Sequence, residues 1–253
     1  MSHMHIPDGV LPAWIVVAGW LIAGAGLALA LGSLPSRADR RPALLGVMSA
    51  LMLVAMSLEL VPIAYHVNLT VLTGIVIGPA LGFVAAFVVN LMLAFFGHGG
   101  ITVVGLNTLT TGLETVLGFY FFRLLGPPLS RRGRVGLAGA LATVLALATG
   151  TGLMIGIVAA SNVNPGIATP QAAAIEPGNL SFRNPFSGGV LTWEVLPGAH
   201  DAAAAPPVGL ATFVELVLAL GAIGWTIEAF ITAIVVRYVA LVRPDLVRRR
   251  SSA

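Results

Sequence analysis

The chain has 253 residues, of which 57% are hydrophobic and only 9% are charged, and its mean hydropathy is +0.97. Soluble domains carry about 25% charged residues, so this composition excludes an ordinary soluble protein and indicates a polytopic membrane protein. The formal net charge is +3. All basic residues are arginine, and a Walker-type phosphate loop needs a lysine, so such a loop is excluded. The lack of cysteine excludes thiolate metal sites, thiol catalysis and disulfides.

Long apolar runs predict the membrane spans. A helix rises about 1.5 Å per residue and needs about 20 apolar residues to cross the hydrocarbon. The first run shows neither a preceding basic region nor a small-residue cleavage site, so we expect a first span and not a cleaved signal peptide. Runs of sufficient length occupy residues 13–32, 43–65, 103–125, 135–160 and 209–241.

The stretch 69–96 is long for one crossing and short for two. Gly78 and Pro79 lie in its middle, and a proline neither donates to the helix ladder nor favours helix in the residue before it. We therefore expect a turn at Gly78-Pro79 that joins a short helix, 67–78, to a longer one, 81–96.

The arginines predict the topology, because short cytoplasmic loops collect them. All three arginine clusters can lie in the cytoplasm only if the stretch 69–96 crosses the membrane twice. The predicted fold is therefore all-α, with seven transmembrane helices, the N-terminus outside and the C-terminus inside. The arginines are not interleaved with aromatic residues, which argues against nucleic-acid binding. The clusters are Arg37, Arg40 and Arg41; Arg131, Arg132 and Arg134; and Arg243, Arg248, Arg249 and Arg250.

This topology brings the histidines to one side of the membrane. We expect a single transmembrane domain, 1–253, with an extracytoplasmic N-terminal segment, 1–12, and an extracytoplasmic loop, 161–208, that contains a short hairpin and His200. The remaining histidines on the external side are His3, His5, His66 and His98.

Glu59 and His66 are the first candidate site residues. Seven positions separate them, so in a continuous helix they lie on one face, although Pro62 between them weakens that argument. An interfacial histidine needs no ligand role, but a carboxylate inside a span costs about 2.5–3.5 kcal/mol and usually faces a cavity or a partner.

Further polar residues could support a ligand histidine. His98, in the turn GHGG, is expected as a hydrogen-bonding neighbour more than as a ligand, and Asn107 is a buried amide that could brace a ligand. Glu228, with Arg237, is expected to order helix packing or a subunit contact. The other intramembrane carboxylates are Glu114 and Glu215.

A histidine near the N-terminus has a specific metal chemistry. When it is the second residue of a chain, the amine, its own backbone nitrogen and its imidazole present three nitrogens in one plane. A fourth nitrogen completes the square that Ni(II) and Cu(II) prefer. The topology delivers His66 to the same side as His3 and His5, so it could supply that fourth nitrogen.

These motifs together resemble a known family. MHIPDG at 4–9, a histidine after the second run, Gly78-Pro79, FGHGGIT at 96–102 with Asn107, and the final span resemble the substrate-capture components of energy-coupling-factor cobalt and nickel transporters, the CbiM/NikM type. The resemblance covers nearly the whole chain except 161–208. It implies a metal site formed by Met4, His5 and His66, seven spans in the prokaryotic cytoplasmic membrane, and Co²⁺ or Ni²⁺ as the transported substrate.

The resemblance also implies partners and leaves one ligand open. The partners are a transmembrane coupling subunit and ATPase subunits, and the resemblance also allows a small accessory membrane subunit. Since Met1-Ser-His precedes Met4, the free amine belongs to Met4 if translation begins there, to Ser2 if Met1 is removed, or to Met1 if it is retained. We favour His5 with His66 and keep His3 as a competitor.

Other functions remain as alternatives. A stand-alone divalent metal permease would transport without ATPase subunits, and a purely structural subunit would bind no metal. A membrane-embedded hydrolase using His66 and Glu59 has no HExxH motif or nucleophile elbow to support it. We expect no enzymatic activity in this chain, because capture and release of an ion need no covalent chemistry.

Overall fold

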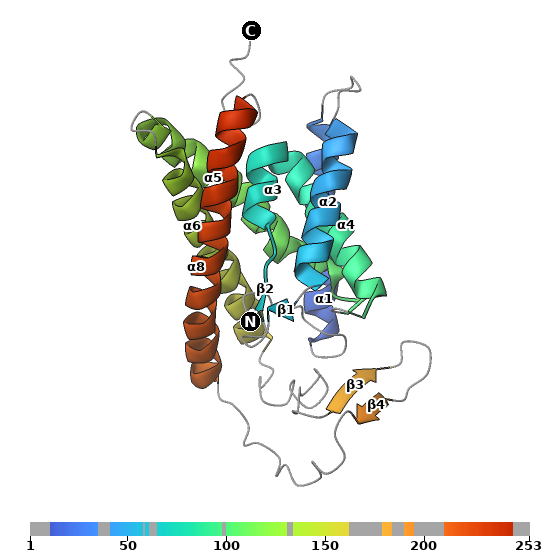
Figure 1. Cartoon of the computed structure of the whole chain (residues 1–253). Coiled ribbons are helices and arrows are strands. Elements are labelled where there is room, and N and C mark those ends of the chain that lie inside the picture. The colour runs from blue at the N-terminus through green and yellow to red at the C-terminus, as the bar shows by residue number, and fades with distance from the viewer. Residues whose placement is uncertain are drawn as a thin grey trace.

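The fold is helical, with two short antiparallel hairpins in addition (Figure 1). The computed structural model describes residues 11–34, 41–57, 59–60, 65–97, 100–130, 134–161, 179–183, 190–194 and 210–244. The helices are α1 (Ala13–Gly32), α2 (Arg41–Ser57), α3 (Thr70–Ile77), α4 (Pro79–Phe95), α5 (Val104–Ser130), α6 (Val135–Ala160) and α8 (Leu210–Val242). The strands are β1 (Glu59–Leu60), β2 (Tyr65–His66), β3 (Asn179–Arg183) and β4 (Val190–Glu194).

The arginine-rich chain segments meet at one end of the helix bundle. Figure 1 shows the start of α2, the end of α5, the start of α6 and the end of α8 together at the top. One arginine of each cluster is described there: Arg41 is the first residue of α2, Arg134 precedes α6, and Arg243 follows α8. Strands β1 and β2 lie toward the other end, so the bundle has an arginine-rich end and a β1–β2 end.

The expected second span, 43–65, is wrong beyond Ser57. Helix α2 ends at Ser57, and the chain then forms the antiparallel pair β1 and β2. A helix continuing to residue 65 would have to accommodate Pro62, which removes a helix hydrogen bond and clashes with the preceding turn. Glu59 and His66 are consequently register partners across two strands and not neighbours on one helical face.

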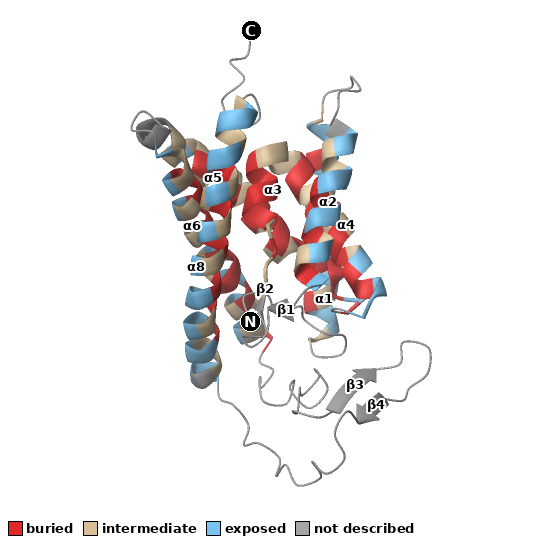
Figure 2. Cartoon of the chain, in the orientation of Figure 1, coloured by how far each residue is buried: buried red, intermediate tan, exposed pale blue. Residues whose placement is uncertain are grey.

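The junction of α3 and α4 confirms the turn expected at Gly78-Pro79. Gly78 has φ of +89°, a conformation that glycine adopts without steric cost, and Pro79 opens α4 at its first position, where a proline loses no helix hydrogen bond. The short α3 is almost wholly buried (Figure 2), whereas the outer helices expose one face each.

Glycines let α3 and its neighbours approach closely. A Cβ at Gly74 of α3 would overlap the carbonyl of Thr115 in α5, and one at Gly105 of α5 would lie 2.8 Å from the backbone of Trp20 in α1. Close backbone approach through small residues is the usual packing mode of helices in a membrane. The core around α3 is formed with α5, α6 and α8, and a second cluster joins α2 to α4.

The outer surface of the bundle is apolar. Leu29, Leu124 and Leu241 are each more than 70% exposed, on three different helices. Continuous apolar exposure of this kind disfavours contact with water and fits contact with lipid. Of the described helices, three are long and apolar enough to cross a membrane: α1, α6 and Phe213–Val242 within α8.

The hairpin expected within 161–208 is present. Strands β3 and β4 pair antiparallel from Asn179 opposite Glu194 to Arg183 opposite Val190.

Candidate functional site

His66 lies at the end of β2, where the chain leaves the β1–β2 pair and turns toward α3. It is half-buried, and its backbone is paired with Glu59. The strand β2 places this residue toward the β1–β2 end of the bundle, and the Nδ1 atom of its imidazole is buried.

Asn68, two residues after His66, is the centre of a buried hydrogen-bond network that sequence reasoning missed. It is 0% exposed. Its backbone N–H donates to Glu228 Oε1 at 3.3 Å, and its Nδ2 donates to Glu114 Oε2 at 3.2 Å. Glu228 belongs to α8 and Glu114 to α5, so one asparagine joins the β2–α3 junction to two helices.

Thr70 closes the network from the α3 side. Its backbone N–H donates to Asn68 Oδ1 at 3.1 Å, which forms an Asx turn directly before α3; the N-cap residue of that helix is Leu69. Its Oγ1 lies 3.0 Å from Asn68 Oδ1 and 2.9 Å from Glu114 Oε2, so its single hydroxyl proton can be donated to either. The signal for this turn was present in the sequence as Asn68-Leu69-Thr70, because an asparagine side chain often bonds to the backbone N–H two residues on.

Glu114 and Glu228 are 1% and 2% exposed. An unpaired buried carboxylate is expensive, and the donors of Asn68 and Thr70 offset that cost. Room for Glu114 comes from α6, because a Cβ at Gly150 would overlap the Glu114 carboxylate. Glu228 was expected to order helix packing, and its contact with Asn68 links α8 to the segment that carries His66.

Leu69, between Asn68 and Thr70, has a left-handed backbone with φ of 56° and ψ of 17°. It is the one non-glycine residue with positive φ among those described. Such a conformation costs on the order of 1–3 kcal/mol and persists only where the surroundings enforce it. Here the hydrogen bonds of Asn68 on one side and the start of α3 on the other enforce it.

Asn107 lies in a second polar contact, between α4 and α5. It is 5% exposed, and its carbonyl accepts hydrogen bonds from Thr110 and Thr111, both at 2.9 Å. Asn90 of α4 donates from Nδ2 to Thr111 Oγ1 at 2.7 Å. The bond from Asn90 to Thr111 joins α4 to α5, whereas the two bonds to Asn107 lie within α5. A brace from Asn107 to a ligand histidine stays a prediction.

The other predicted ligands lie outside the described residues. These are His3, Met4 and His5, together with the predicted neighbour His98. Within the described parts of the chain, no group of three or more histidine, aspartate and glutamate side chains has the arrangement of a metal site. His66 is therefore the one predicted ligand whose position the structure gives.

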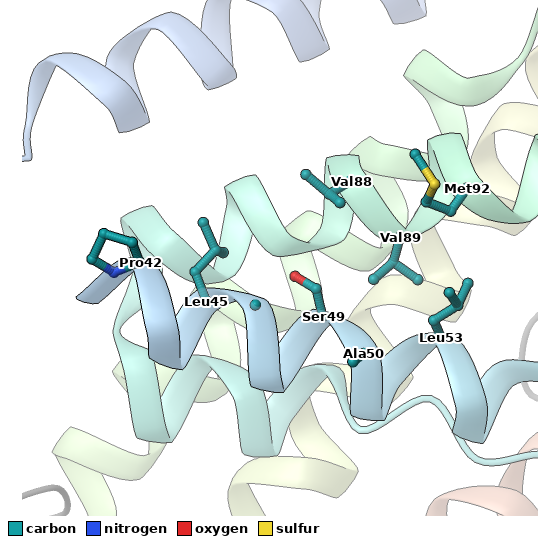
Figure 3. A pocket seen from close by; sticks show the side chains of 9 residues that line it. Pro42, Leu45, Ser49, Ala50, Leu53, Val88, Val89 and Met92 are labelled. Carbon is teal, nitrogen blue, oxygen red and sulfur yellow. The ribbon is translucent and has the colours of Figure 1, made fainter. Parts of the chain in front are cut away.

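A groove between α2 and α4 has a mostly apolar lining, unlike the polar surroundings of Asn68 (Figure 3). Its volume is about 370 Å³, and Leu45, Leu53 and Val88 are among its apolar lining residues. Ser49 supplies one hydroxyl and Met92 one thioether. Co(II) and Ni(II) favour nitrogen ligands such as imidazole, so this groove does not suit them.

Comparison with known proteins identifies the class of membrane protein. Residues 5–246 match the family CbiM, described as the cobalt uptake substrate-specific transmembrane region. A "Putative metal transport protein" of Methanocaldococcus jannaschii is 31% identical over 249 residues, 96% of this chain and 94% of the relative. A relative of the same description from Haloquadratum walsbyi is 29% identical over 251 residues, 96% of this chain and 93% of its own length.

Solved structures agree on the fold. A crystal structure of a transition metal transporter superposes with a TM-score of 0.64 at 22% identity, covering 94% of this chain and 93% of that one. A truncated transition metal transporter gives 0.62 at 21% identity, covering 94% of this chain and 98% of the other. The match across 5–246 includes both ends of the bundle and the β2–α3 junction. The chain belongs to the CbiM family of membrane proteins for metal transport.

Proposed function

We propose that this chain is the substrate-binding membrane subunit of an ATP-driven transporter of the energy-coupling-factor type, which imports Co²⁺ or Ni²⁺ across the prokaryotic cytoplasmic membrane. The metal is captured on the external side and released inward when ATPase subunits act through a transmembrane coupling subunit. Family membership supports metal transport. The absence of lysine supports placing ATP hydrolysis on a partner, because the chain cannot form a Walker loop.

The observation that carries the site proposal is the placement of His66. It is half-buried at the β1–β2 end, away from the arginine-rich end, and a buried network starts two residues after it. Arginine-rich ends face the cytoplasm, so His66 faces outward. The imidazole of His66 joins the nitrogens of Met4 and His5, with His3 as the competing N-terminal imidazole, around one ion.

The short α3 is compatible with seven spans. Its eight residues rise about 12 Å, and the four residues 65–68 before it add about 13 Å if extended, which together approach the hydrocarbon thickness of about 30 Å. Non-helical backbone is tolerated at that depth only when protein covers it. Asn68 and Thr70, both 0% exposed, meet that condition.

Isothermal titration of the purified chain with Ni(II) and with Co(II) tests the proposal. Wild-type protein binds one ion tightly, and His66→Ala abolishes tight binding while the thermal unfolding profile is retained. Thr149→Ala is the control, because Thr149 is exposed on α6 and its hydroxyl only bonds back to Leu145. Tight binding by His66→Ala would move the site elsewhere, and no binding by the wild type would overturn the metal-capture function.

A further inference from the structure

We infer that Asn68 is a positioning residue for metal binding: with Glu114 and Glu228 it fixes the backbone two residues from His66, so that movement of α8 changes the metal affinity. The inference rests on the proposed role of His66 as a ligand and adds the mechanical link by which a partner could make the site release its ion.

The first step is the number of anchors at one point of the chain. The N–H and Nδ2 of Asn68 donate to two carboxyl groups on two helices, at 3.3 Å and 3.2 Å, and its Oδ1 accepts from the N–H of Thr70, the first residue of α3. Hydrogen bonds between buried groups are electrostatically stronger than the same bonds in water. The position of residue 68 is thereby tied to α5 and α8 together.

The second step is the short distance along the chain from Asn68 to His66. Only Val67 separates them, and Leu69 on the other side is held in a left-handed conformation. No helix intervenes to absorb a displacement of residue 68. The backbone of His66 is held on its other side by the pairing of β2 with β1. A shift at Asn68 therefore changes the angle at which the imidazole approaches an ion.

The third step is the reach of α8. Glu228 lies near its middle, and the helix continues for 14 residues to Val242 at the arginine-rich end. At about 1.5 Å per residue, about 21 Å of continuous helix connects Glu228 to that end of the bundle. A helix of that length transmits a tilt or translation at the arginine-rich end to the Glu228 carboxylate, and from there to the N–H of Asn68.

The fourth step is the space beside Gly150 of α6 that the Glu114 carboxyl group occupies. The glycine at position 150 leaves space that the carboxylate fills, so α6 fixes the second anchor. Outer-shell partners of this kind change metal affinity by about 10–100-fold when they are removed.

Asn68→Ser tests the inference while keeping a side-chain oxygen that can accept from the N–H of Thr70, because serine forms the same kind of turn as asparagine. The matched control is Asn90→Ser, since Asn90 is another buried asparagine, 2% exposed, whose Nδ2 bonds to Ala86 and Thr111 instead. Affinities for Ni(II) and Co(II), the absorption bands of bound Ni(II) and the thermal unfolding midpoint are measured for each full-length protein. Asn68→Ser weakens binding about tenfold or more and shifts the bands.

Asn90→Ser lowers the unfolding midpoint but changes affinity by less than about threefold, because sites without shared partners act independently. A double variant that exchanges the amide and the carboxyl group between positions 68 and 114 tests whether metal affinity can be rescued. Asn68→Asp places a carboxylate against Glu114 and weakens binding, whereas Asn68→Asp with Glu114→Gln restores the donor and acceptor in reversed order and recovers affinity. Destabilisation alone would not produce that recovery.

The outcomes separate the inference from the proposed function. If His66→Ala abolishes binding while Asn68→Ser binds as tightly as the wild type, the inference is wrong and the metal site stands. Equal weakening in Asn68→Ser and Asn90→Ser, or no recovery in the double variant, also overturns it. If the wild type binds no metal, or His66→Ala binds normally, the proposed site fails and the inference fails with it.

Discussion

Asn68 and Glu228 are 160 residues apart in the sequence and meet through a hydrogen bond of 3.3 Å from the backbone N–H of Asn68 to the carboxylate of Glu228. The bond closes the bundle by joining the β2–α3 junction to the last helix. A buried N–H without a partner would cost about 1–3 kcal/mol, so the contact stabilises the irregular backbone that carries His66.

The pH dependence of metal binding follows from its proposed nitrogen ligands. Imidazole, amine and amide must each lose or lack a proton to bind, so protons compete with the ion. We expect affinity for Ni(II) to fall steeply from neutral to acid pH, as measured by titration calorimetry across that range in matched buffers. A flat profile would indicate oxygen-dominated coordination and exclude the proposed ligands.

Gly74→Ala is expected to disrupt the fold. The added methyl group would overlap the carbonyl of Thr115, and neither backbone can move without separating α3 from α5. We expect a loss of about 3 kcal/mol or more, at the upper end of overpacking costs, or failure to accumulate in the membrane. Thermal unfolding in detergent measures it.

Gly24→Ala and Gly152→Ala are the controls for that substitution. A Cβ at either helical position meets nothing within 4 Å. Alanine is favoured over glycine in a helix by about 0.5–1 kcal/mol, so both variants should be as stable as the wild type or slightly more so. Similar behaviour of Gly74→Ala and these controls would contradict the close approach of α3 and α5.

Leu69→Ile isolates the strain of the left-handed residue. The two side chains have the same atoms, but the β-branch of isoleucine makes positive φ a severe outlier. We expect a loss of stability about 1–2 kcal/mol greater than for Leu117→Ile, within the range of backbone strain at such positions. Leu117 also packs on the core around α3 but lies within regular helix. Equal losses for the two variants would show that Leu69 is unstrained.

Gly150→Ala tests whether the space that Gly150 leaves for the Glu114 carboxyl group matters for metal binding. The methyl group would displace the carboxylate and so disturb its bonds to Asn68 and Thr70. Metal affinity should fall by about tenfold, the lower end of outer-shell effects. Gly156→Ala on the same helix, with open space at its Cβ, should leave affinity unchanged. Unchanged affinity in both variants would show that the position of Glu114 does not influence the metal site.

The absence of cysteine allows the orientation to be measured by single-cysteine labelling. Ser33→Cys lies at the arginine-rich end, after α1, and Ile101→Cys lies at the opposite end, between α4 and α5. An impermeant maleimide added to intact cells should label Ile101→Cys, which is an exposed position, and should leave Ser33→Cys unlabelled until the cells are opened. The reverse pattern would invert the topology.

The sequence predicted the regular helices well because their signals are local. Unbroken apolar runs identified α1 and α6 to the residue, and Gly78-Pro79 marked the junction of α3 and α4. The error lay between the two helices: α2 ends at Ser57 and α3 begins at Thr70, although the apolar composition of the sequence continues between them. Hydropathy cannot distinguish a buried extended segment from a helix, and the effect of Pro62 was underestimated.

The candidate site was predicted only in part, because the sequence shows unusual single residues but not the contacts between distant ones. Glu114 and Glu228 were recognised as unusual because a carboxylate in an apolar helix is costly wherever it lies. Their common partner, Asn68, was not recognised, because the contacts join residues 46 and 160 positions apart and depend on the packing of α5 and α8. An asparagine near a helix end gives no sign of such distant partners.

X-ray absorption spectroscopy at the nickel edge tests the central claim most directly, on Ni(II)-loaded wild-type protein and on His66→Ala held in excess Ni(II), so that the weakened site of the variant is also filled. The proposed site gives a nitrogen-dominated, square-planar first shell with imidazole scattering from two rings in the wild type and from one in the variant. An oxygen-rich octahedral shell, or the same imidazole contribution in both proteins, would contradict metal capture by His66 and the N-terminal nitrogens.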